Sequence, residues 1–105
     1  MSASNFSVNH DGSGNITLTG AMTFDNAEAI LQRTRAVVEA QDTIVIDLTE
    51  VEQTDSASLA LLLEWIAMAR STAGALQFQR IPERVLAIAE TGEVSDLIRR
   101  YSVSS

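Results

Sequence analysis

The chain has 105 residues, the size of a single domain, and its hydrophobic fraction of 46% is ordinary for a globular protein and argues against disorder. It has no cysteine, which excludes a disulfide framework, a thiolate zinc site and a thiol nucleophile. The 14 acidic and 7 basic residues give a net charge of −7 without any basic cluster, so we expect no nucleic-acid binding and no attraction to an anionic membrane.

The sequence also carries no sign of export or membrane insertion. Its first residues lack the charged and apolar regions of a signal peptide. The longest apolar run, residues 59–69, contains Glu64 and is too short to cross a bilayer. We therefore expect a cytoplasmic protein.

The N-terminal segment predicts a β-hairpin. Phe6–His10 alternates weakly in hydrophobicity, as an edge strand does. Residues 11–14 are typical of a turn, and residues 15–19 alternate cleanly between apolar and polar side chains. We expect the second strand to end at Gly20.

An amphipathic helix and a buried strand come next. Asp25 and Glu28 have the spacing of a capping box. Apolar residues then recur at helical intervals, which predicts a helix over residues 26–40. Residues 43–48 are almost continuously apolar and β-branched, which is typical of a central strand. A short acidic loop that ends at Thr54 is expected after this strand.

A second helix, a strand and a third helix complete the predicted order. The second helix is expected over Ser56–Thr72, with Gly74 as its C-terminal cap. Residues 75–79 alternate as a strand does, Pro82 suits the first turn of the third helix, and Gly92 ends it. The apolar residues that follow receive no assignment. The order β-β-α-β-α-β-α predicts a layered α/β domain with a mixed sheet of about four strands and helices mainly on one face.

The residues do not favour catalysis, a cofactor or a metal. Gly12 and Gly14 are not followed by the lysine of a phosphate-binding loop and are interpreted as a turn. His10 is interpreted as a surface residue. The acid–base candidates are Asp47, Glu50, Glu52 and Asp55. Glu50 and Glu52 are expected on a solvated polar loop, and Asp47, near the end of the central strand, is interpreted as a hydrogen-bonding partner for loop amides. We therefore expect a protein that is not an enzyme.

The start of the second helix is the best candidate for a functional surface. A helix that begins at Asp55 or Ser56 has free N–H groups and a positive dipole end. In one interpretation, either residue is simply the N-cap. In the other, the helix start is a recognition or phosphorylation point, and a phosphate on Ser56 would add negative charge there.

The second helix carries two apolar stripes. One contains Leu62 and Ile66 and is expected to face the sheet. The other contains Leu61, Trp65 and Met68, residues of the kind enriched at interfaces. Either this second stripe contacts a partner, the interpretation we prefer, or neighbouring helices cover it.

These segments together resemble STAS domains. In that family a strand that ends in Asp-Leu or Asp-Phe leads to Asp-Ser/Thr-x-Gly and an apolar helix. Residues 44–48, 51–54 and 55–63 are similar to this pattern, and residues 18–20 are similar to an earlier turn of the family. The resemblance covers residues 6–98, and it implies one STAS-like α/β domain over residues 1–105 with flexible termini.

Two branches of the family are similar. Residues 55–65 most resemble the STAS subunit of bacterial phospholipid ABC transporters. This resemblance implies binding to the cytoplasmic ATPase, support of transport that maintains outer-membrane lipid asymmetry, and association with the inner membrane only through that partner. The alternative is an anti-sigma factor antagonist, in which a kinase phosphorylates the serine at the position of Ser56 and thereby blocks binding.

The resemblance therefore predicts a partner-binding site at the helix start and along the second stripe. Ser56 is its candidate phosphorylation site. The family usually has glycine where this chain has Ser58, and we interpret a side chain there as favouring static docking over a phosphorylation switch. The predicted site consists of Thr54, Asp55, Ser56, Ser58, Leu61, Trp65 and Met68.

Overall fold

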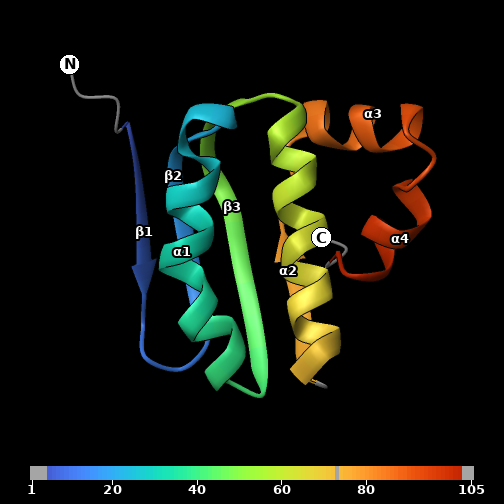
Figure 1. Cartoon of the computed structure of the whole chain (residues 1–105). Coiled ribbons are helices and arrows are strands. Elements are labelled where there is room, and N and C mark those ends of the chain that lie inside the picture. Colours follow the sequence, from blue (N-terminus) through green and yellow to red (C-terminus); the bar gives the residue numbers. More distant parts are fainter. Residues whose placement is uncertain (1–4, 73, 103–105) are drawn as a thin grey trace.

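The structure is a computed structural model that describes residues 5–72 and 74–102 (Figure 1). The termini expected to be flexible are those outside residues 6–98, and of these, residues 1–4 and 103–105 lie outside the described residues. The elements in chain order are β1 (Phe6–His10), β2 (Asn15–Met22), α1 (Phe24–Ala40), β3 (Thr43–Thr54), α2 (Ser56–Thr72), β4 (Ala75–Gln79), α3 (Glu83–Thr91) and α4 (Ser95–Arg100).

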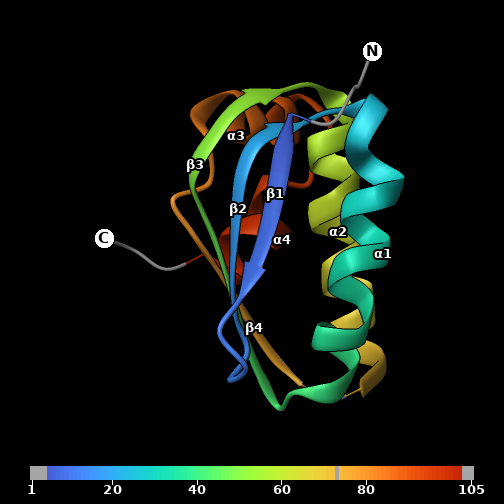
Figure 2. The same cartoon turned by 90° about the vertical axis from the view of Figure 1, so that its left-hand side faces the viewer.

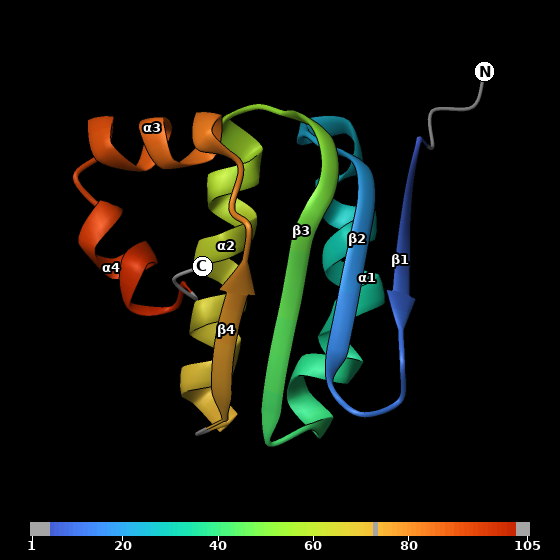
Figure 3. The same ribbon diagram turned by 180° about the vertical axis from the view of Figure 1, so that it is seen from behind.

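The strands form one mixed sheet in the order β1-β2-β3-β4. β1 pairs antiparallel with β2, whereas β2 with β3 and β3 with β4 are parallel. Helices α1 and α2 lie side by side on one face of the sheet, and none of the helices in the described residues covers the opposite face (Figures 1 and 2). Figure 3 shows α3 and α4 beyond β4, at the edge of the sheet. The predicted α/β architecture with helices mainly on one face is confirmed.

The core lies between the sheet and the helix pair. Side chains alternate along a strand, so each strand turns every second residue toward α1 and α2. The strand side chains that are buried there are Ile16, Leu18, Met22, Ile44, Ile46, Leu48, Leu76 and Phe78. Within the described ranges, no helix is both long and apolar enough to span a membrane.

Two strands are longer than predicted. β2 continues past Gly20 to Met22, and β3 continues to Thr54, so the expected acidic loop is strand. The two extensions pair with each other, with Met22 opposite Thr54. Gly20 has φ +94° and a Cβ there would lie 2.1 Å from a backbone oxygen, so this glycine allows an irregular register rather than ending the strand. The acidic side chains on this part of β3 are exposed, which is why composition suggested a loop.

Helix α1 begins at Phe24, two residues before the predicted start, whereas the bounds of α2 agree with the predicted ones. α2 spans Ser56–Thr72, and the N–H of Gly74 donates to the carbonyl of Ala69 at 2.9 Å, as a C-terminal cap does. Pro82 immediately precedes α3, and Gly92 follows it. The unassigned apolar segment contains α4. After α4 the chain returns to the free side of β4, where Ser102 bridges to Phe78.

The β1–β2 turn lies at the opposite end of the sheet from the start of α2 (Figure 1). The carboxylate of Asp11 accepts hydrogen bonds from the Asn15 side chain and from the N–H groups of Ser13 and Asn15. These bonds lower the pKa of Asp11. The glycine-containing segment is therefore a turn held by its own side chains, as predicted.

Candidate functional site

The start of α2 is organised around the carboxylate of Asp55. Its Oδ1 accepts a hydrogen bond from the N–H of Ala57 at 2.8 Å, which caps α2. Its Oδ2 accepts one from the N–H of Phe24, the first residue of α1, at 3.1 Å. One carboxylate thus caps two helices. The capping box predicted at Asp25 and Glu28 is wrong, because α1 begins at Phe24 and receives its cap from Asp55 instead.

The side chain of Ser58 connects the start of α2 to the sheet by hydrogen bonds. Its Oγ accepts a hydrogen bond from the N–H of Asp55 at 3.1 Å and donates one to the carbonyl of Met22, at the end of β2. The residue is completely buried. The expectation that Ser58 belongs to an exposed partner surface is therefore wrong. A glycine at this position would make neither side-chain bond, so the hydroxyl has a structural role in this chain.

Ser56 is the residue that the helix start presents to solvent. It is exposed, and its hydroxyl makes no hydrogen bond within residues 5–72 and 74–102. Thr54, just before the junction, is half-buried and lines a shallow depression together with Glu52 and Arg84. The predicted residues therefore divide at the junction: Asp55 and Ser58 build it, whereas Ser56 and part of Thr54 are accessible.

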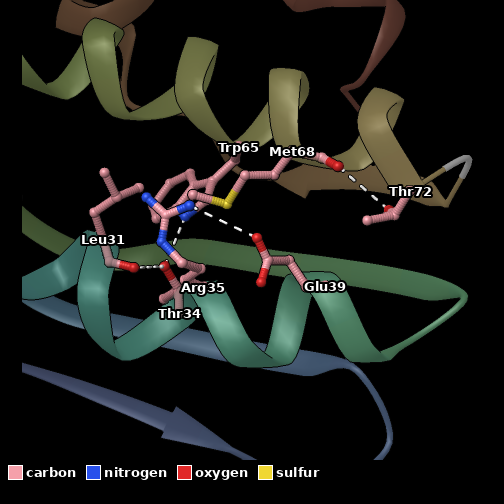
Figure 4. Close-up of polar contacts among 7 residues, drawn as sticks. All are labelled: Leu31, Thr34, Arg35, Glu39, Trp65, Met68 and Thr72. Carbon is pink, nitrogen blue, oxygen red and sulfur yellow. Dashed lines mark hydrogen bonds and ion pairs between the residues drawn. The ribbon is translucent and has the colours of Figure 1, made fainter.

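The second stripe of α2 lies inside the molecule. Leu61, Trp65 and Met68 expose 2%, 0% and 6% of their surface. The indole N–H of Trp65 donates to the hydroxyl of Thr34 on α1 at 2.8 Å, and that hydroxyl donates to carbonyls one turn earlier in α1 (Figure 4). The Trp65 ring also lies 6.2 Å from that of Phe78. The expected exposed stripe is wrong, because α1 covers it.

The sequence alone missed an apolar groove between the first turns of α1 and α2. Its volume is about 300 Å³, and the surface that lines it is apolar. Phe24 stands at its end with 79% of its surface exposed, and no other large hydrophobic side chain within the described ranges is exposed. Phe24 lay outside the predicted helix, so nothing in the sequence placed it here. The groove is lined by Phe24, Ala27, Glu28, Leu31, Ala57, Ala60, Leu61 and Glu64.

The arrangement at the junction is suited to recognition rather than to proton transfer. Both oxygens of Asp55 are occupied by backbone N–H groups. Asp47 accepts hydrogen bonds from the N–H and hydroxyl of Thr49, in agreement with its predicted bonding to a local amide. Among residues 5–72 and 74–102 there is no group of three side chains that could hold a metal ion.

Comparisons with known proteins concern the family and the fold of the chain. The family model described as "Mlab, STAS domain" matches residues 6–99. No curated protein sequence matches the chain. Among solved structures, the unphosphorylated anti-sigma factor antagonist SpoIIAA is similar, with a TM-score of 0.70, 13% identity, and coverage of 95% of this chain and 87% of that one. A sulfate transporter family protein from Wolinella succinogenes has a TM-score of 0.66, 14% identity, and coverage of 89% and 77%. At such low identities, the structural similarity shows a common fold and nothing further.

Proposed function

The chain belongs to the MlaB-type STAS domain family, and on that premise we propose that it is a non-enzymatic subunit of a bacterial phospholipid ABC transporter. It binds and supports the cytoplasmic ATPase of that transporter, which maintains the lipid asymmetry of the outer membrane. It needs no cofactor of its own, and it reaches the inner membrane only through its partner.

The observation that carries this proposal is the exposed pair of Phe24 and Ser56 on either side of Asp55. An exposed phenylalanine beside an apolar groove is costly to leave in water and is typical of a partner contact. The Asp55 carboxylate fixes the backbone at Phe24, and its bond to Ala57 fixes the turn that carries Ser56. Such a surface loses little conformational entropy on binding.

The buried members of the predicted site support this surface from beneath. Ser58 ties α2 to β2, and Trp65 ties α2 to α1. In the proposal, these buried residues do not contact the ATPase. They influence its binding by holding the two helix starts at a fixed separation. Thr54, Asp55 and Ser56 then form the polar part of the contact, and Phe24 forms the apolar part.

Co-purification with the ATPase of a bacterial phospholipid ABC transporter tests the proposal. Phe24→Ala combined with Ser56→Glu should abolish binding and lipid export, because the variant removes the apolar contact and places a charge at the helix start. Ser7→Glu is the matched control, because Ser7 is exposed on β1, outside the junction. If the double variant retains both ATPase binding and export, this surface is not the contact.

The second candidate is an anti-sigma factor antagonist controlled by phosphorylation of Ser56. The accessible, unbonded hydroxyl of Ser56 supports it, since a kinase could reach that atom without unfolding the helix. The candidate predicts a mass gain of one phosphate at Ser56 after incubation with a sigma-regulating kinase and ATP. An unmodified chain under those conditions argues against it, and Ser56→Ala is the control for the site.

A further inference from the structure

We propose that the groove between α1 and α2 binds an amphipathic helix whose apolar face is flanked by basic side chains. This inference rests on the proposed function in one respect, because it assigns that helix to the transporter ATPase. The chemistry of the groove is argued from its own shape and charge.

The shape of the groove comes from small residues on facing helices. Ala27 on α1 and Ala57 and Ala60 on α2 leave the space between the two helix starts unfilled. The helices lie side by side on the sheet, and both run away from the same end of it (Figures 1 and 2). A third helix can place a row of side chains between two such helices, with apolar anchors three or four residues apart.

The charge at the groove is negative on both walls. Glu28 projects from α1 and Glu64 from α2, and both residues are exposed and line the groove. Neither carboxylate forms an ion pair within the described part of the chain.

Among the described residues, neither arginine of α1 forms an ion pair with Glu28 or Glu64. The guanidinium of Arg33 lies over the ring of Phe6, 4.8 Å from its centroid. Arg35 forms an ion pair with Glu39 at 3.6 Å, further along the helix (Figure 4). The groove therefore offers an apolar floor between two uncompensated carboxylates, which complements an apolar stripe flanked by lysine or arginine.

Two exposed carboxylates at the rim act mainly on the rate of association. Charge pairs at an interface rim steer encounter, and salt screens them. Replacing both carboxylates by amides preserves the shape of the groove and removes only the charge. If the proposed helix binds here, replacing the two carboxylates by amides should weaken its binding at low salt but not at high salt.

The first experiment measures binding of the purified ATPase to the chain as salt is varied. Glu28→Gln with Glu64→Gln should weaken binding by about threefold or more in low-salt buffer, and by much less in about 0.5 M NaCl. Glu90→Gln with Asp96→Asn is the control, because it changes the net charge equally at exposed residues of α3 and α4. Equal behaviour of the two double variants overturns the inference. Failure of the unaltered chain to bind the ATPase overturns the proposed function instead.

The second experiment tests the groove without the ATPase. Its probe is a designed helical peptide of about 18 residues, or about five turns, with leucines on one face and lysines on both flanks. A second peptide has glutamate in place of each lysine. The lysine peptide should shift the backbone amide resonances of Ala57 and Ala60, and the glutamate peptide should leave them unchanged. Equal shifts with both peptides, or none with either, overturn the inference whatever the ATPase does.

Discussion

The two halves of the contact between α1 and α2 differ sharply, although the same pair of helices forms both. In the C-terminal half, Trp65 fills the space, its N–H bonds to Thr34, and the contact is closed. In the N-terminal half, Ala57 and Ala60 leave a groove, and Phe24 stands exposed at its end. Hydrophobicity does not separate the halves, since both are apolar. The halves differ instead in the volume of their side chains and in the presence of a hydrogen-bonding partner.

This difference shows where stability and recognition are located. Burying a tryptophan without an acceptor for its N–H costs free energy, and Thr34 supplies that acceptor for Trp65. Residues in the closed half should therefore decide whether the domain folds. Residues in the open half should decide what it binds, and variants in the two halves should affect different measurements.

The largest effect on stability is expected from Trp65→Ala in the closed half. Removing this completely buried ring should lower the free energy of unfolding by about 3–5 kcal/mol, because a cavity remains. Urea denaturation measures the loss. If the denaturation midpoint scarcely changes, the closed half does not determine the stability of the domain, and the proposed difference between the halves is wrong.

Thr34→Val should have the next largest effect. The two side chains are similar in size, but valine leaves the indole N–H of Trp65 buried without an acceptor, at a cost of about 1–3 kcal/mol. Thr34→Ser keeps the hydroxyl and should lose less stability than Thr34→Val. The reverse order in thermal unfolding would show that packing of the threonine methyl matters more than the hydrogen bond.

Asp55→Ala tests the boundary between the halves. The variant uncaps both helices, so we expect it to lower the free energy of unfolding by about 2 kcal/mol, more than the loss of one ordinary N-cap. Asp25→Ala is the matched control, because Asp25 makes no capping bond in α1 and should change stability by less than about 0.5 kcal/mol. Equal losses for the two variants would contradict a double cap.

Phe24→Ala should have the smallest effect on stability of these variants. Its effect on ATPase binding should exceed its effect on stability by the widest margin. Its ring is mostly exposed, so the free energy of unfolding should change by less than about 0.5 kcal/mol. Binding of the proposed ATPase should nevertheless weaken by about tenfold or more, measured by calorimetry. If the Phe24→Ala protein unfolds easily, or if it binds the ATPase normally, the open half does not have the separate binding role given to it here.

The sequence predicts most of the fold because its signals are local. The bounds of α2 and the cap at Gly74 follow from neighbouring residues, and the parallel strands follow from the alternation of strands and helices. The stripe that contains Trp65 was assigned wrongly because α2 is apolar on two sides. Which apolar side of α2 is covered depends on where α1 packs, and the sequence of α2 does not contain that information.

The candidate site was predicted in part for the same reason. The position of Asp55 and Ser56 at a helix start follows from the local sequence, and the structure has the helix start there. The role of Phe24 does not, because the residue that fixes its backbone is 31 positions away in the sequence. The inward direction of Ser58 likewise depends on a carbonyl 36 positions away. No local pattern contains such pairings.

The double cap at Asp55 also has a consequence for synthesis of the chain. Chains are made from the N-terminus, so Phe24 and the rest of α1 leave the ribosome before Asp55 does. The first turn of α1 cannot receive its cap until β3 and the start of α2 have followed. The cap on α2 is local and needs only residues 55–57, whereas the cap on α1 requires that all residues from 24 to 55 have been made.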